Sequence, residues 1–84
     1  MTDNTARYLK EAATAMAEFG PEFNVVYRWD TVSIEFTLTE IKDEDRERQI
    51  EGAITWEGLA VLGYNPLTFA LREAKERLKA KPWW

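Results

Sequence analysis

Apolar and polar residues alternate without interruption along residues 32–39, which is the pattern of a β-strand with one buried face. The same alternation runs through residues 23–29, just upstream. A tight turn at residues 30–31 would join the two segments as an antiparallel hairpin whose apolar side chains share one face, because a slip of one residue would turn one apolar set toward solvent. The expected pairs are Trp29 with Val32, Tyr27 with Ile34, Val25 with Phe36 and Phe23 with Leu38. We therefore predict strands over about residues 22–29 and 32–41.

A third alternating segment predicts a further strand over about residues 49–57, with its isoleucines on the apolar face. The continuation of the chain has two interpretations. A tight turn at Gly58 would return residues 59–62 as a short fourth strand. Alternatively, residues 56–62 form a helical turn that ends at Gly63. The sequence leaves both interpretations open.

Two segments have apolar residues at the three- and four-residue spacing that is typical of amphipathic helices. The first spans about residues 4–19 and ends at Gly20 and Pro21, because glycine accommodates a left-handed backbone and proline blocks continuation. The second spans about residues 66–80 and begins after Asn65, which is a favourable N-cap residue. The expected buried stripes are Leu9, Ala12, Ala13, Met16 and Phe19 in the first helix, and Leu67, Ala70, Leu71, Ala74 and Leu78 in the second.

These elements predict a single α+β domain over residues 1–84, because a chain of 84 residues forms one core. The expected architecture is a small α/β sandwich of element order α-β-β-β(-β)-α. It has an antiparallel sheet of three or four strands with both helices packed on one face. That face is expected to carry Phe23, Val25, Tyr27, Ile34, Phe36, Leu38, Ile50 and Ile54. The opposite face is then exposed to solvent.

The chain is acidic, with a net charge of −4. Residues 1–65 carry six basic against thirteen acidic side chains, a net −7, whereas residues 66–84 carry five against two, a net +3. A nucleic-acid-binding surface usually shows a dense basic stripe, and only the last helix comes near one. The element order is similar to that of double-stranded RNA-binding domains, but residues 65–69 lack the lysine cluster with which those domains begin their last helix. We therefore do not expect nucleic acid as a partner.

The composition excludes several kinds of chemistry. The chain contains no histidine and no cysteine, which excludes Ser/His and Cys/His nucleophile pairs and the zinc sites built from those ligands. The charged run at residues 42–48 lacks the residue order and the glycine of a calcium loop, and two arginines neutralise part of it. We expect a solvated connection or a helical turn there, and no catalytic residue, metal or cofactor.

The exposed face of the sheet is the first candidate binding surface. Alternation along the strands places Glu35, Thr37, Glu51, Thr55 and Glu57 on it. Neighbouring carboxylates can perturb one another's pKa values, as catalytic pairs do. However, antiparallel sheets commonly carry Thr and Glu on the solvated side, and no residue type completes a catalytic set around these acids. We interpret this surface as an acidic interaction face.

Aromatic residues outside the expected core form the second candidate surface. Tyr64 and Phe69 lie off the apolar stripes, and Trp83 and Trp84 lie in a tail over residues 82–84. Tyrosine and tryptophan are enriched at protein interfaces, where they bury a large area with few rotatable bonds. The alternative is that the two tryptophans fold back over the core of the same chain.

Together these patterns favour a non-enzymatic protein–protein interaction module of the adaptor, inhibitor or regulator type. The expected partner-binding residues are Glu35, Glu51, Glu57, Tyr64, Phe69, Trp83 and Trp84. The expected partner is another protein, or a second copy of this chain. Two alternatives stay open: a nucleic-acid-binding domain that uses the basic last helix and the tryptophan tail, and a small carboxylate-dependent enzyme. No apolar run is long enough to span a membrane and the N-terminus is not a signal peptide, so we predict a cytoplasmic protein.

Overall fold

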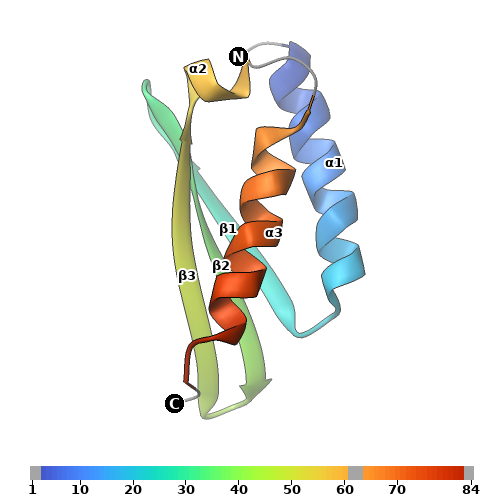
Figure 1. Ribbon diagram of the computed structural model, residues 1–84, viewed down its shortest axis with the longest axis vertical. Coiled ribbons are helices and arrows are strands. Elements are labelled where there is room, and N and C mark those ends of the chain that lie inside the picture. The colour runs from blue at the N-terminus through green and yellow to red at the C-terminus, as the bar shows by residue number, and fades with distance from the viewer. Residues whose placement is uncertain (1–2, 61–63, 83–84) are drawn as a thin grey trace.

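The computed structural model describes residues 3–60 and 64–82. Helix α1 spans Asp3–Phe19, strands β1, β2 and β3 span Phe23–Trp29, Ser33–Asp43 and Arg46–Thr55, and helices α2 and α3 span Trp56–Leu59 and Pro66–Lys79. In the described part of the chain the strands form one antiparallel sheet of order β1-β2-β3. Both long helices lie on the same side of this sheet (Figure 1). The predicted α+β architecture is thereby confirmed.

The hairpin between β1 and β2 has a longer turn than the sequence pattern predicted. Trp29 pairs with Ile34 rather than with Val32, so the predicted pairing is wrong by two residues. The reason is the Asp30 carboxylate, which accepts hydrogen bonds from the backbone N–H groups of Val32 at 2.8 Å and Ser33 at 2.9 Å and so holds Val32 in the turn and Ser33 at the start of β2. A shift of two residues keeps every side chain on its predicted face, because the side-chain period of a strand is two.

These hydrogen bonds also lower the pKa of the Asp30 carboxyl group. The Ser33 N–H and then the Val32 N–H hold the pKa of Asp30 below its ordinary value of 3.8, because both favour the ionised carboxylate. The turn is therefore arranged around a charged side chain that binds backbone N–H groups. Such an Asx turn is a common start of a reverse turn.

The charged run at residues 42–48 is a second hairpin rather than the solvated connection or helical turn that we expected. Strand β2 continues to Asp43 and β3 begins at Arg46, with a register irregularity between Ile41 and Asp43. The Asp43 carboxylate accepts from the Arg46 Nε at 2.8 Å and from the backbone N–H of Asp45 at 3.0 Å. Side-chain hydrogen bonds of this kind hold the hairpin together. The alternation of apolar and polar residues, by which a strand is usually recognised in a sequence, is absent here.

Arg48 joins this hairpin to the end of α3. Its side chain is only 9% exposed. The guanidinium donates to the Glu40 carboxylate at 2.7 Å and to the backbone carbonyls of Lys79 at 3.2 Å and Lys81 at 2.8 Å. The last carbonyls of a helix have no partner within the helix, so this arginine satisfies groups that would otherwise need water.

Helix α2 stands where one of the two interpretations placed a fourth strand. The Thr55 hydroxyl accepts from the backbone N–H of Gly58 at 3.0 Å, which caps the helix. The Trp56 indole N–H donates to the Asp30 carbonyl at 2.7 Å and ties α2 to the first hairpin. The helical interpretation is confirmed up to residue 60, and the fourth strand does not form at residues 59–60. Residues 61–63 lie outside the described part of the chain.

The core lies between the sheet and the two long helices. Its buried residues include Tyr8, Ala12, Phe19, Ile34, Phe36, Leu38, Leu59, Leu67, Leu71, Ala74 and Leu78. The predicted stripe of α3 is confirmed, with Ala70 packed at its border. The predicted stripe of α1 is wrong at Ala13, which is exposed, and Leu9 and Met16 are only partly buried.

Two polar contacts determine which flank of α1 faces α3, and so explain why Ala13 is exposed. The Asn65 side-chain amide donates to the Glu11 carboxylate at 3.0 Å, and Arg72 lies 3.8 Å from the Glu18 carboxylate. Glu11 and Glu18 are separated by two helical turns, so both lie on the flank of α1 that faces α3. Ala13 therefore lies on the opposite flank.

Candidate functional site

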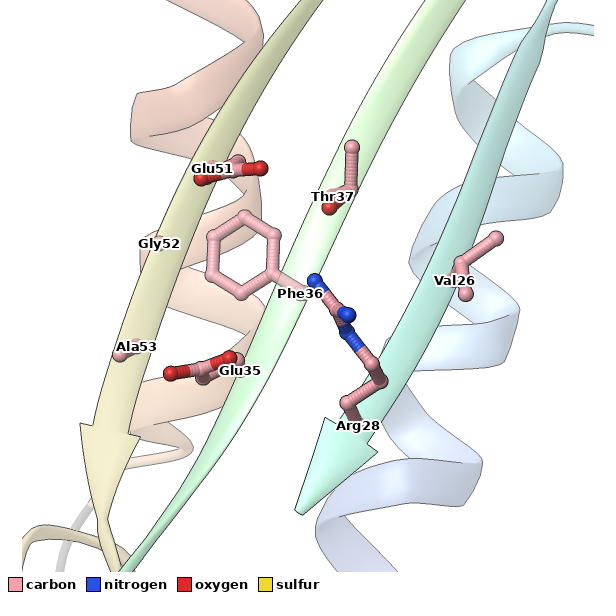
Figure 2. Close-up of a pocket in the computed structure, with 8 residues that line it drawn as sticks. All are labelled: Val26, Arg28, Glu35, Phe36, Thr37, Glu51, Gly52 and Ala53. Carbon is pink, nitrogen blue, oxygen red and sulfur yellow. The ribbon is translucent and has the colours of Figure 1, made fainter.

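The face of the sheet that the helices leave uncovered is the candidate site, and we call it the open face. It consists of the side chains that alternate with the buried ones along the three strands: Asn24, Val26, Arg28, Glu35, Thr37, Thr39, Gln49, Glu51 and Ala53. A shallow pocket of about 260 Å³ lies on this face, over the middle of the sheet (Figure 2). The open face is therefore a slightly hollowed surface and not a deep cleft.

The antiparallel register arranges the pocket residues in two rows across the sheet. One row contains Val26, Thr37 and Glu51, and the next contains Arg28 and Glu35, followed by Ala53. The Arg28 side chain extends from β1 over β2 (Figure 2). Arg28 and Glu35 are directly opposite each other in neighbouring strands, a position in which opposite charges attract. Glu51 has the uncharged Thr37 as its cross-strand neighbour, so the β3 side of the pocket is the more acidic side.

The floor of the pocket is an aromatic ring from the core side of the sheet. Phe36 lies opposite Gly52 in the β2–β3 register. Its ring lies between β2 and β3 and points toward the glycine (Figure 2), so that a Cβ atom on Gly52 would lie only 2.5 Å from the Phe36 Cζ. The glycine is thus the residue that lets the Phe36 ring pack against the β3 backbone. This packing fills the space below the pocket and keeps it shallow.

The structure brings together some of the predicted site residues and separates others. Glu35, Thr37 and Glu51 lie on the open face, as the alternation predicted. Glu57 does not, because it belongs to α2. Thr55 ends β3 with its hydroxyl engaged as the cap of α2. The predicted cluster of three glutamates is therefore wrong, and the pocket itself carries two.

The predicted aromatic residues form a separate feature on the helix layer. Tyr64 and Phe69 pack edge to face with ring centroids 6.0 Å apart. Both remain exposed, at 54% and 57%. They flank the first turn of α3, on the other side of the sheet from the open face. Trp83 and Trp84, the other two predicted contact residues, lie outside the described part of the chain.

Two further exposed apolar residues lie on the strand face that the sequence pattern predicted to be apolar. Trp29 is 62% exposed and Val32 is 65% exposed, both at the turn between β1 and β2. Alternation places them in phase with buried neighbours, but at this end the hairpin lies away from the two long helices α1 and α3 (Figure 1). Strand alternation predicts the face on which a side chain lies, and it contains no signal for how far the covering layer reaches.

Each basic residue of the last helix and the turn after it has a contact within the protein. Arg72 lies 3.8 Å from the carboxylate of Glu18, and Arg77 lies 3.9 Å from that of Glu73. Lys79 lies 3.6 Å from the carboxylate of Glu76. Lys75 lies over the rings of Phe19 and Phe23. Lys81 donates from its Nζ to the Gln49 backbone carbonyl at 3.0 Å. The basic stripe expected from the sequence is therefore interleaved with carboxylates.

The residues that the structure describes include no group of three or more acidic side chains placed to hold a metal ion. None of the helices within residues 3–60 and 64–82 has both the length and the apolar character that crossing a membrane requires. Comparisons of this chain with known protein families, with curated proteins and with solved structures find no match.

Proposed function

We propose that this protein is a non-enzymatic protein–protein interaction module that binds a partner through the open face of its sheet. The observation that carries the proposal is that two helices cover one side of a three-stranded sheet and leave the other side bare, with Glu35 and Glu51 beside an apolar centre. Val26 in that centre is 56% exposed. Exposed apolar groups bordered by polar ones are typical of interaction surfaces.

The charges of the open face indicate the character of the partner. Glu35 and Glu51 lie at the pocket, with Arg28 as the basic residue among its lining residues. Complementary charge raises the rate of encounter and disfavours partners of the wrong sign. We therefore expect the partner to present a small apolar contact surrounded by basic residues.

The enzymatic alternative is less well supported by the geometry of the acids. Catalytic carboxylates usually lie in desolvated clefts where burial or a close like charge alters their proton affinity. Glu35 and Glu51 are both exposed, and they lie on a shallow surface. Glu35 also has Arg28 as its cross-strand neighbour.

The nucleic-acid alternative is also less well supported. Its basic residues lie on and just after α3, where Glu18, Glu73 and Glu76 neutralise part of their charge. A phosphate backbone would have to compete with these carboxylates, and it would be repelled by the acidic remainder of the surface. The predicted stacking platform, Trp83 and Trp84, lies outside the described residues.

Affinity capture with charge-reversed variants tests the proposal. The double variant Glu35→Arg/Glu51→Arg changes the open face, and Glu73→Arg/Glu76→Arg makes the same change in charge on exposed positions of α3. We expect the native chain and the α3 variant to capture the same protein from a lysate of the source cells. We expect the open-face variant to lose that protein, with binding reduced at least tenfold when the purified pair is measured, about 1.4 kcal/mol.

We expect circular dichroism to show that each variant keeps the native fold, because the changed residues are exposed in both cases. Capture of the same protein by the native chain and by the open-face variant would contradict the proposal. Loss of capture only with the α3 variant would contradict it as well and would favour a surface on the helix layer.

A further inference from the structure

The sheet has two free edges, and they differ in how they are protected. In the described part of the chain no strand lies beyond β1 or beyond β3. A free edge presents unpaired backbone N–H and C=O groups to any other strand, so proteins usually block edges with lysine, proline, charged side chains or bulges. An edge without such protection is available for pairing with another strand.

The β3 edge is blocked. Lys81 reaches from the end of α3 and donates its Nζ to the Gln49 backbone carbonyl at 3.0 Å. Glu47 and Glu51 lie along the same strand, two positions on either side of Gln49. Charged side chains on an edge strand and a lysine bound to its backbone are both devices that oppose pairing.

Of these devices, the β1 edge carries only one charged side chain. Its seven residues, Phe23–Trp29, contain no proline, no lysine and no acidic side chain, and Arg28 is the one charged residue. The pairing with β2 runs through all seven residues without a register shift, so no bulge twists the edge away. Strand β1 begins beneath the C-terminal end of α1 and diverges from that helix toward its own far end (Figure 1).

The direction of the backbone groups of β1 follows from the bonds at its two ends. The Asp30 N–H donates to the Ser33 carbonyl, and the Ile41 N–H donates to the Glu22 carbonyl. Hydrogen-bonded pairs alternate along an antiparallel ladder, so the even-numbered residues of β1 bond to β2. The backbone groups of Val25 and Tyr27, in the middle of the strand, therefore point to the free edge.

We propose that two copies of this chain associate through their β1 edges, side by side and antiparallel, and form a continuous six-stranded sheet. A two-fold axis at Val26 keeps all seven residues of the strand paired. It places outward-pointing backbone groups opposite one another, because Val25 of one copy then faces Tyr27 of the other. Such an interface is isologous, the commonest arrangement in symmetric dimers, and the strand addition is β-augmentation.

The side chains in this register are self-complementary. Tyr27 faces Val25 and Trp29 faces Phe23, which are aromatic–aliphatic and aromatic–aromatic pairs of the kind that stabilise sheets. Arg28 faces the neutral Asn24, so the pairing of the two strands brings no like charges together. Two-fold pairing through β3 about Gln49 would instead place Glu47 of one copy directly opposite Glu51 of the other.

In the proposed dimer the second copy would meet the outer flank of α1 in the helix layer. The flank of α1 that faces away from α3 carries the exposed Ala13 and Ala17, next to the partly buried Leu9 and Met16. These side chains are uncharged and two of them are small, so they allow the close approach of a neighbouring element. Since the axis is perpendicular to the sheet, both helix layers lie on one side, and the two open faces form one larger surface on the other side.

Sedimentation equilibrium of the purified chain tests the association, and a single cysteine tests its geometry. We expect the mass of two chains, in reversible equilibrium with the monomer. A residue on the axis lies opposite itself with its Cα atoms about 4.5 Å apart, within the range of a disulfide. Because the chain has no cysteine of its own, Val26→Cys should form a covalent dimer on mild oxidation. Ala53→Cys, equally on the open face but on β3, should do so much more slowly.

Charge substitution at the same two positions completes the experiment. Val26→Lys places two ammonium groups opposite each other on the axis and should weaken dimerisation several-fold. Ala53→Lys should leave dimerisation unchanged. A monomer at every concentration, equal oxidation of the two cysteine variants, or a dimer weakened by Ala53→Lys and not by Val26→Lys would each overturn the inference.

This inference goes beyond the proposed function and is tested separately from it. The open-face variant Glu35→Arg/Glu51→Arg should lose its captured partner and remain dimeric, since neither residue lies on β1. Dissociation of the dimer by that variant would place the contact between copies on the open face and contradict the edge-to-edge arrangement. A stable dimer that captures no protein would leave the edge-to-edge arrangement intact and contradict the proposed function.

Discussion

The close contact between Phe36 and Gly52 is the single-residue feature that most directly determines the floor of the candidate site. The Phe36 ring occupies the volume in which a side chain at position 52 would lie, with Cζ and Cε1 within 2.6 Å of an ideal Cβ. Gly52 thus serves packing, because its lack of a side chain admits a large buried ring. A glycine in a strand interior usually weakens the strand, and here the aromatic contact offsets that weakness.

Substitution of this glycine should therefore be costly although it adds only a methyl group. We expect Gly52→Ala to reduce the free energy of unfolding by about 1 to 3 kcal/mol, because the Phe36 ring must move from its position in a packed core. Ala53→Val, one residue along on the exposed face, should change it by less than about 0.5 kcal/mol. Urea denaturation of the three proteins measures both values. Equal stability of Gly52→Ala and the native chain would contradict the packing described for the ring.

At the scale of elements, Arg48 connects the β2–β3 hairpin with the end of α3. Arg48, a residue of β3, donates hydrogen bonds to the backbone carbonyls of Lys79 and Lys81. The Glu40 carboxylate balances the charge of the Arg48 guanidinium. Without this residue, a partly buried carboxylate and two carbonyls would lose their partner. The hairpin and the helix are therefore expected to be stabilised together.

Replacement of Arg48 tests this connection. We expect Arg48→Met to reduce the free energy of unfolding by about 3 kcal/mol, because removal of one partner of a buried ion pair leaves the other uncompensated. Arg46→Met removes the exposed ion pair with Asp43 and should cost less than about 1 kcal/mol. Thermal and urea denaturation measure the two effects, and an Arg48→Met variant no less stable than Arg46→Met would contradict the connecting role of Arg48.

The elements themselves could be predicted from the sequence where apolar residues mark them, and not elsewhere. The alternation in β1 and β2 gave the correct faces, but the register depended on the hydrogen bonds of Asp30, which leave the hydrophobic pattern unchanged. The hairpin around Asp43 was not predicted, since it contains no apolar signal and Arg48 finds two of its partners more than thirty residues away in the chain. Thr55 was correctly assigned to a strand, but the role of its hydroxyl as the cap of α2 was not predicted.

At the scale of the whole molecule, the candidate site could be predicted only in part. Glu35 and Glu51 were placed on the correct face because a strand period of two suffices to assign a face. The difference between the two sheet edges could be predicted only in part, because one of the features that block the β3 edge is Lys81 reaching Gln49 from the end of α3. Tertiary contacts of this kind decide which surface remains available, and they have no local pattern.

Both proposals depend on one claim, that the helices cover one face of the sheet and leave the other bare. Solvent paramagnetic relaxation of methyl resonances by a soluble gadolinium chelate tests this claim most directly. We expect strong relaxation for the Ala53 and Thr37 methyl groups and weak relaxation for those of Ile34 and Leu38, which lie buried beneath the helices. Strong relaxation of Ile34 and Leu38 together with protection of Ala53 would contradict it.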